Sequence, residues 1–339
     1  MGIRDLWPFL RRRKASLFTA VPPRALRGRR VAVDGGDLLY HGMHACGTPA
    51  GPVLQRWFED RLGSLAARGA DLTVVLDGAG LAAAKRAERG RRADVRARTA
   101  GRAHARGDHA AAARAALAPS GATIDALCRA CAVVHGVRVV QAPHEAEAEA
   151  ARRTRTAVPA DRVDAVLTRD GDALAFGARE VLLRQNGTEE LLRVRLVEVL
   201  RALDLRTEAQ FVDFCVLCGS DFCPRIPKVG PVGALALLHA HGSLAAAWER
   251  ELGAWPAART EAFRTEAPRA RGIFWSPRRW SPADVAVLRA TKAHFRWTTS
   301  RSFGSCPSSP RASSASALRD TRPARPPRAR SISPRSERA

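Results

Sequence analysis

The chain has 339 residues, with 56 basic against 33 acidic side chains and a formal net charge of +23. This length can bury the core of one large domain or two small ones, and the charge predicts attraction to a polyanion, with nucleic acid as the first candidate. We expect neither a transmembrane helix nor a signal peptide, because the longest apolar runs are short and the basic residues near the start follow the apolar ones.

Four short apolar runs predict β-strands, at 31–34, 72–77, 137–140 and 163–168. Longer alanine-rich stretches between them suit helices. Continuous apolar strands that alternate with helices are typical of a mostly parallel sheet covered on both faces. The sequence therefore predicts an α/β fold.

The segment 85–106 carries nine basic and two acidic side chains and almost no large apolar ones. Because it cannot bury an apolar face, we expect it at the surface or against a charged partner. Its composition alone leaves both a solvated helix and a nucleic-acid contact open.

The helical pattern returns from 207 to 244, with a glycine- and proline-rich hairpin at 224–233. Five of the seven tryptophans follow between 248 and 297, where they could stack on bases or pack in a peripheral layer. The serine-, proline- and arginine-rich stretch 301–339 predicts a disordered tail, which could tether nucleic acid, direct nuclear import or only solubilise the protein.

Two Cys-x-x-Cys pairs, Cys128/Cys131 and Cys215/Cys218, raise the question of a zinc site. The pairs are too far apart for a zinc ribbon and lie in apolar, helix-like surroundings. We expect them to be core residues of a protein from a reducing compartment.

Acidic residues follow every predicted strand. Asp34 and Asp77 close the first two strands, and two further pairs follow the others, Glu145 with Glu147 and Asp170 with Asp172. A single aspartate after a strand is a common helix cap, but the carboxyl ends of parallel strands meet at one edge of the sheet. Carboxylates gathered there repel one another unless divalent cations bind. Two Mg²⁺ or Mn²⁺ ions could activate water and stabilise a leaving oxygen in phosphodiester hydrolysis.

The motifs, taken together and in order, resemble the structure-specific 5′ nucleases of the flap endonuclease and XPG type. The resemblance covers about residues 1–295 and rests on seven segments: MGIRDLWPFL, VAVDGGDLLY, VVLDG, AKRAERGRR, APHEAEAEAA, LTRDGDALAFG and FVDFCVLCGSDFCPRIPKVGPVGALAL. It implies a PIN-like fold with a helical arch and a helix-two-turn-helix element. The implied parts are a nuclease core at 1–205 with an arch insertion at 85–122, a duplex-binding helical part at 206–299 and the tail at 300–339.

The resemblance also assigns roles to individual residues. Tyr40 matches a base-stacking aromatic, and Lys85 with Arg86 match a catalytic basic pair at the foot of the arch. The matched metal ligands are Asp34, Asp77, Glu145, Glu147, Asp170, Asp172 and Asp221. The implied nucleic-acid contacts are Gly2, Arg91, Arg92 and Arg96, and, in the hairpin, Arg225, Lys228, Gly230 and Gly233. The implied cofactors are two Mg²⁺, for which Mn²⁺ could substitute, and K⁺ at the hairpin.

The sequence departs from the family pattern in three places. The segment between Asp77 and Lys85 lacks a further lysine that usually precedes the arch, so Arg86 is the stronger candidate for that role. The hairpin reads Lys228-Val229-Gly230-Pro231-Val232 where the family has Gly-hydrophobic-Gly-Pro-Lys, and the tail lacks a sliding-clamp motif.

We therefore expect a monomeric, metal-dependent endonuclease or exonuclease that cuts branched, 5′-flap DNA in replication or repair in the nucleus. An RNA-cutting enzyme on the same scaffold, acting in a cytoplasmic viral replication compartment, is the alternative. Within the acidic run, Glu149 matches no ligand position and is predicted to pair with Arg152 or Arg153 at helical spacing.

Overall fold

The protein is described here from a computed structural model, which covers residues 2–78, 83–185 and 188–276; within the first helix after residue 82, the side chains of 83, 84, 86 and 87 are not described. Contacts divide the chain into Met1–Arg296 and Trp297–Ala339, and every described residue lies in the first unit. The predicted tail and residues 277–299 of the predicted duplex-binding part lie outside the described residues.

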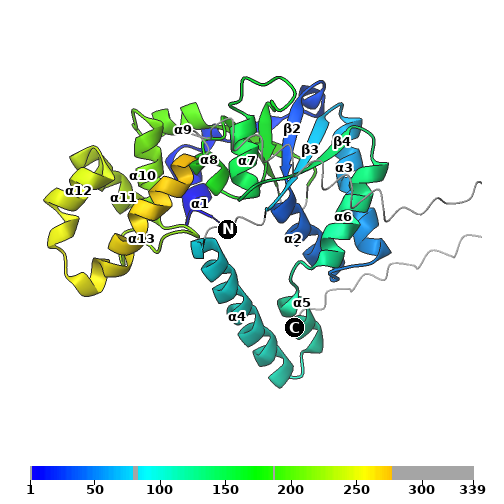
Figure 1. The fold of residues 1–339 in the computed structure, drawn as a ribbon, viewed down its shortest axis with the longest axis horizontal. Helices are drawn as coiled ribbons and strands as arrows, with labels where there is room; N and C mark the ends of the chain where they lie inside the picture. Colours follow the sequence, from blue (N-terminus) through cyan, green and yellow to red (C-terminus); the bar gives the residue numbers. More distant parts are fainter. Residues whose placement is uncertain (1, 79–82, 186–187, 277–339) are drawn as a thin grey trace, which may run out of the picture. The chain divides into compact units, whose positions relative to one another are not determined.

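A seven-stranded mixed sheet forms the centre of the described unit (Figure 1). Its strands are β1 (Thr19–Val21), β2 (Arg30–Asp34), β3 (Asp71–Leu76), β4 (Val137–Gln141), β5 (Ala165–Leu167), β6 (Glu180–Arg184) and β7 (Leu191–Arg195). They lie in the order β1-β7-β6-β5-β2-β3-β4. The five from β6 to β4 are parallel, and β7 and β1 add antiparallel to one edge. The four predicted strands and the α/β class are confirmed.

The chain changes direction across the sheet at β2. From β2 it proceeds through β3 to β4 at one edge, and then returns to place β5 on the other side of β2. In open parallel sheets, the order of the strands reverses at such a point, and the connections that follow the two neighbouring strands lead to opposite sides of the sheet. This leaves a crevice at the carboxyl ends of those two strands. Strands β2 and β5 therefore open onto the place where a ligand site is expected.

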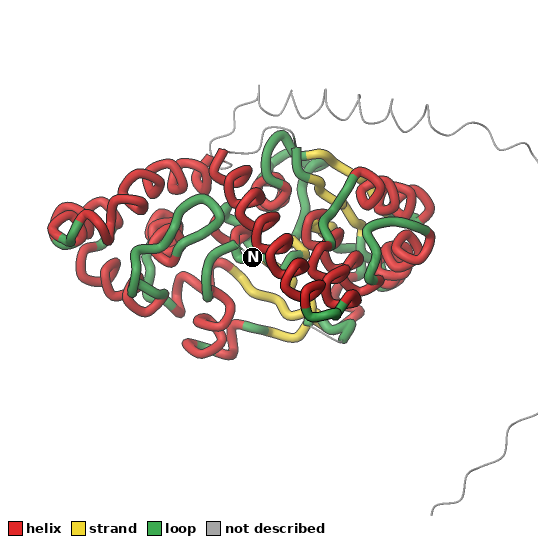
Figure 2. Tube along the Cα trace, turned by 90° about the horizontal axis from the view of Figure 1, so that it is seen from below, coloured by secondary structure: helices red, strands yellow, loops and turns green. Residues whose placement is uncertain are grey.

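Helices cover both faces of the sheet, as Figure 2 shows from a second direction. One face packs against α2 (Gly35–Cys46), α3 (Pro52–Ala67) and α6 (Gly121–Val133), and the other against α1 (Leu6–Arg13), α7 (Ala146–Arg153) and α8 (Asp172–Ala175). Strands β2, β3 and β5 are apolar along almost their whole length because both of their faces are buried.

A helical hairpin projects away from the sheet (Figure 1). It consists of α4 (Ala83–Ala105) and α5 (His109–Ala116), joined by a turn in which Gly107 has a φ of 74° and Asp108 caps α5. Among the described side chains of α4 only Lys85 and Ala103 are buried. The hairpin occupies the predicted arch segment, and the exact part boundaries stay predictions.

The C-terminal helices form a second packed group beside the sheet (Figure 1). They are α9 (Leu196–Ala202), α10 (Glu208–Cys218), α11 (Pro231–His241), α12 (Leu244–Arg250) and α13 (Ala257–Trp275). Asp213 of α10 joins three of them, because it accepts a hydrogen bond from the amide of Leu244 at 3.0 Å and one from Nε of Arg271 at 2.6 Å.

Three tryptophans lie near this group of helices. Trp248, Trp255 and Trp275 are partly buried against the core, which favours packing in a peripheral layer over base stacking for these three. Trp280 and Trp297 lie outside the described residues. In the two cysteine pairs, Cys128 is half-buried and Cys131, Cys215 and Cys218 are buried. None of the four forms a disulfide, and all belong to the core clusters, as predicted. No helix in the described part of the chain has the length and apolar character needed to cross a membrane.

A candidate active site of buried carboxylates

Asp34 lies at the centre of the site. It is the last residue of β2, is 2% exposed, and caps α2 by accepting a hydrogen bond from the amide of Asp37 at 3.1 Å. Its other oxygen accepts a hydrogen bond from the hydroxyl of Thr168, at 2.7 Å, just beyond β5. Burial, with a smaller contribution from the charge of Asp37, raises the pKa of Asp34 to about 7.

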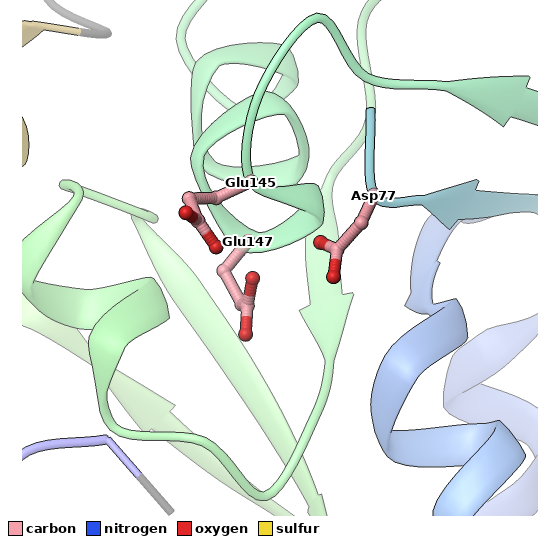
Figure 3. A group of neighbouring side chains, drawn as sticks. All are labelled: Asp77, Glu145 and Glu147. Atoms are coloured by element: carbon pink, nitrogen blue, oxygen red, sulfur yellow. The ribbon is translucent and has the colours of Figure 1, made fainter. Parts of the chain in front are cut away.

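Asp77, Glu145 and Glu147 form the second part of the site (Figure 3). Asp77 follows β3, and Glu145 and Glu147 lie at the start of α7, so that one oxygen from each lies within 4.8 Å of the others. The backbone explains this approach, because Oδ1 of Asp77 accepts a hydrogen bond from the amide of Ala146 at 2.8 Å. Glu145 is the N-cap residue of α7, one position before the helical first turn in which it was predicted.

Asp170, Asp172 and Asp221 complete the set of buried acids. Oδ1 of Asp170 accepts a hydrogen bond from the amide of Asp172 at 2.9 Å. Neither carboxylate oxygen of Asp172 has a hydrogen-bond partner among the described residues. Asp221 arrives from the loop after α10, and an ammonium group of α4 links it to Glu145 and Glu147. The seven predicted ligands therefore meet at the carboxyl ends of the parallel strands.

Gly2 lies directly against this cluster. Its φ is 75°, and a Cβ atom there would lie 1.7 Å from Oδ1 of Asp170 and 2.8 Å from Oδ1 of Asp172. A glycine is needed because a side chain would collide with both acids and would be strained at this φ. The expected nucleic-acid contact of Gly2 stays a prediction, but its position beside the acids gives it a structural role.

The electrostatics of the cluster show the cost of placing these acids together. Burial, then the charge of Asp170, raises the pKa of Asp172 well above its usual value, and burial likewise raises that of Glu147. Burial alone lowers the pKa of Lys85, but the charges of Glu147 and Glu145 outweigh it and hold that pKa well above its ordinary value. Lys85 is therefore a buried ammonium among acids that are hard to ionise together.

Four basic side chains of α4 line the same cleft as the acids: Lys85, Arg89, Arg92 and Arg96. Their spacing along α4 puts them on one helix face. Lys85 Nζ lies 3.3 Å from Glu145, 3.6 Å from Asp221 and 3.9 Å from Glu147, while Arg89 pairs with Asp77 and Arg92 with Asp221. Arg91, also expected to touch nucleic acid, lies off this face and pairs with Glu88.

The cleft has a volume of about 380 Å³ and runs between α4 and α2. Tyr40 and Asp37 of α2 also line it, together with Leu39 and Leu76. The half-buried Tyr40 ring lies 6.4 Å from that of His44, at an interplanar angle of 17°. An aromatic ring and basic side chains that line one cleft offer a base and a phosphate suitable surfaces.

The other predicted contacts lie apart from the acids. Arg225 pairs with Asp5 at 2.9 Å, Lys228 is exposed with a φ of 66°, and Gly230 is the N-cap of α11. Gly233 follows in the first turn of that helix. Arg86 belongs to α4 by its backbone, but its side chain lies outside the described part of the chain, so its catalytic role stays a prediction.

Sequence analysis missed two residues of the site. Arg89 was not singled out within the basic segment, although its spacing of four from Lys85 places it on the same helix face. Thr168 was read only as the end of a strand, although its hydroxyl contacts Asp34 and accepts a hydrogen bond from the amide of Asp170 at 3.0 Å. A hydroxyl residue two positions before an acidic ligand is the signal that could have identified it.

The donor set fits divalent metal ions. All seven candidate ligands are carboxylates, which are the ligands that Mg²⁺ and Mn²⁺ prefer. The two oxygens of Asp172 and Oε1 of Glu145 are buried without a hydrogen-bond partner among the described residues, which is costly unless another group satisfies them. Oxygen ligands with unmet bonding capacity at the strand ends are what a metal site requires.

Comparison with known proteins agrees with this arrangement. Residues 136–221 match the XPG I-region family model. Flap endonuclease 1-A of Physcomitrium patens is 40% identical over 121 residues, and flap endonuclease 1 of Ajellomyces capsulatus (strain NAm1 / WU24) is 39% identical over the same length. Each match covers 34% of this chain and 29% of the relative, so the chain matches less than a third of either relative's length.

Solved structures share the fold over a larger part of the chain. The catalytic core of Rad2 in complex with DNA substrate aligns with a TM-score of 0.60 and 19% identity, over 85% of this chain and 93% of that one. Human GEN1 in complex with Holliday junction DNA aligns with a TM-score of 0.55 and 22% identity, over 80% of this chain and 66% of that one. Flap endonuclease-1 from Methanococcus jannaschii aligns with a TM-score of 0.52 and 20% identity, over 76% of this chain and 81% of that one.

The sheet, its flanking helices and the acids at the strand ends define a PIN-like nuclease fold. Through its I-region and the segment that it shares with flap endonucleases, the chain is similar to the XPG-type flap endonucleases.

Proposed function

We propose that the chain is a metal-dependent phosphodiesterase that cuts branched DNA near the junction of single and double strands. The observation that supports this best is the complete set of seven carboxylates gathered in one site, six of them buried and Asp77 half-buried. Five of the seven line the cleft together with basic side chains of α4. A descendant that only bound nucleic acid would not need to keep so costly a cluster. The proposed setting is nuclear DNA replication or repair, which the similarity to flap endonucleases of eukaryotes supports.

Each wall of the cleft has a separate role in this proposal. Asp34, Asp77, Glu145, Glu147, Asp170, Asp172 and Asp221 would hold two Mg²⁺ ions. When bound, these ions supply Lewis-acid chemistry that activates water and stabilises the leaving oxygen. Tyr40 would stack the base beside the cut phosphate, and the cations of α4 would orient that phosphate and offset its charge. Arg86 would add a bidentate contact to the same phosphate.

The loop and helix from 219 to 235 would hold the duplex backbone. Its amides at the start of α11 and the exposed Lys228 suit a phosphate chain. Val232, where the family pattern has lysine, is 74% exposed and offers no charge. We therefore expect a weaker grip on the duplex than that pattern provides, and this substitution is also the feature that favours the alternative RNA substrate. K⁺ at this hairpin stays part of the proposal.

A cleavage assay with matched substrates tests the proposal. Purified protein would receive 5′-labelled flap DNA, nicked duplex DNA and single-stranded RNA, each with Mg²⁺, Mn²⁺ or a chelator. We expect metal-dependent cutting of the flap near its junction, and its loss in Asp170→Asn. The control variant Asp60→Asn changes an exposed acid of α3 and should cut normally. Preferential cutting of RNA would favour the alternative, and cutting by Asp170→Asn would overturn the metal-site assignment.

A further inference from the structure

Three basic side chains of α4 are ion-paired with the acids assigned to metal. Lys85 contacts Glu145, Glu147 and Asp221, Arg89 contacts Asp77, and Arg92 contacts Asp221. Lys85 is 7% exposed, so its ammonium group is not a surface cation that happens to lie nearby. The protein itself therefore supplies positive charge to the cluster in which a metal would bind.

Lys85 and a divalent ion need the same oxygens. Among the described residues, Asp77, Glu145 and Glu147 form a group whose ligand atoms lie close enough to share one ion, and Lys85 contacts two of these three residues. A cation that coordinates Glu145 and Glu147 would lie within a few ångströms of the Lys85 ammonium, where two positive charges repel strongly. The burial of Lys85 reduces the screening of that repulsion by water.

The same ion pairs hold the base of α4 in place. Apart from Lys85, Ala103 near the far end is the only buried residue among the described side chains of this helix. The apolar contacts that usually fix a helix are therefore scarce along α4, and its cations provide its link to the strand ends. Removal of those pairs should loosen the base of the helix.

We propose that Lys85, together with Arg89 and Arg92, is a built-in counter-ion for the metal-free acid cluster, and that a divalent cation displaces it. The displacement would release the base of α4 and free three cations for the phosphates of the nucleic acid. This inference rests on the proposed function, because it assigns the same cluster to metal.

Two linked consequences follow from displacement. Whatever removes the Lys85 charge should tighten metal binding, and metal binding should loosen α4, because coupling between two sites is reciprocal. Calorimetric titration of the full chain with Mn²⁺, without nucleic acid, measures the first consequence. Lys85→Met, which keeps the length of the side chain, should bind at least about fivefold more tightly than the wild type.

Three further variants make the titration specific. Lys85→Arg keeps the charge, and its affinity for Mn²⁺ should stay within about twofold of that of the wild type, which is a small change compared with the usual coupling between two sites. Arg98→Met removes a charge from an exposed position of α4 that forms no ion pair with any described side chain, and it should not change the affinity for Mn²⁺. Arg92→Met should tighten binding as Lys85→Met does, and it serves as the main variant if Lys85→Met fails to fold.

Hydrogen exchange measures the second consequence. Mn²⁺ should increase exchange of the α4 amides in the wild type, and in Lys85→Met those amides should exchange faster even without metal. Unchanged or weaker Mn²⁺ affinity in both Lys85→Met and Arg92→Met, or added protection of α4 by Mn²⁺, would overturn the inference. If these results are obtained but the wild-type protein cuts DNA, the displacement is wrong and the proposed function survives. If the wild-type protein binds no metal at all, both the displacement and the proposed function fail.

Discussion

The hydroxyl of Thr168 donates a hydrogen bond to Oδ2 of Asp34 across 2.7 Å, and thereby joins the ends of β5 and β2 at the point where the sheet changes direction. The same hydroxyl accepts a hydrogen bond from the amide of Asp170. One buried side chain thus fixes two of the acids assigned to metal.

Replacement of Thr168 by valine should destabilise the protein by about 1–3 kcal/mol, because it leaves a carboxylate oxygen and an amide buried without partners. Urea unfolding in a chelator measures this cost. Thr188→Val changes an exposed threonine and should alter the free energy of unfolding by less than about 0.5 kcal/mol. An equal effect of both substitutions would contradict the role given to Thr168.

Glu149 should be essential for stability and not for metal binding. It is fully buried and bonded to Arg152 at 2.8 and 2.9 Å and to Arg153 at 2.6 Å, which confirms the pairing predicted from helical spacing. Glu149→Ala should cost about 3 kcal/mol or more, because it strands two buried guanidinium groups that Asp161 only partly compensates. Thermal unfolding tests this.

The exposed pair of Glu261 and Arg264 supplies the control, since Glu261→Ala should cause no measurable change in stability. At a temperature where Glu149→Ala is folded it should still bind Mn²⁺, whereas Glu145→Ala and Glu147→Ala should not. Loss of metal binding in the folded Glu149→Ala protein would show that the wrong acids of α7 have been assigned.

Asp172→Asn should stabilise the metal-free protein. The wild-type carboxylate is buried, lacks hydrogen-bond partners among the described residues and is repelled by Asp170, so that removal of its charge relieves a native-state cost of roughly 1 kcal/mol or more. Mg²⁺ should raise the melting temperature of the wild type more than that of the variant. Asp164→Asn should instead destabilise the metal-free protein, because the Asp164 carboxylate accepts a hydrogen bond from the amide of Arg30. A less stable Asp172→Asn protein in chelator would refute this account.

The metal-free protein should lose stability as the pH rises from about 3.8 to about 7, in the part of the profile that Asp34 controls. The pKa of Asp34 is higher in the folded state than in the unfolded state, so the folded state holds its proton more tightly. The stabilisation is complete below the pKa of the unfolded state and disappears as the pH rises through the pKa of the folded state. Denaturation measured across this interval should be flatter in Asp34→Asn, and a profile parallel to that of the wild type would argue against the shift.

Arg96 should contact phosphate without first breaking an ion pair, because it lines the cleft and has no recorded ion pair among the described side chains. Arg96→Ala should weaken DNA binding at all sequences and reduce the slope of log affinity against log salt by about one. Arg138→Ala, at the amino end of β4 and paired with Asp71, is the control and should leave the slope unchanged. Equal slopes for Arg96→Ala and the wild type would remove Arg96 from the interface.

The acids at the strand ends were predictable because two simple patterns coincide. Runs such as VAVD and LTVVLD are apolar throughout, as buried parallel strands must be, and each ends in a carboxylate. Three strands, β1, β6 and β7, were not predicted. β7 alternates leucine or valine with arginine, and β1 has only three residues, so neither shows the continuous apolar pattern on which the interpretation depended.

The position of the Lys85 ammonium was beyond sequence reasoning for a different reason. It depends on the angle at which α4 leaves the sheet, and no local pattern determines that angle. Asp221 joins the site from a loop after α10, where strand-end logic does not apply, and only the family resemblance identified it.

The bond between Thr168 and Asp34 spans 134 positions of the chain. A contact so distant in sequence forms only after a large loop has closed, and it cannot exist in any partly folded state in which β2 and β5 have not paired. The repulsion between Asp34 and Asp170 is therefore absent until β2 and β5 meet. That part of the charge of the site cannot oppose any folding step that precedes this pairing.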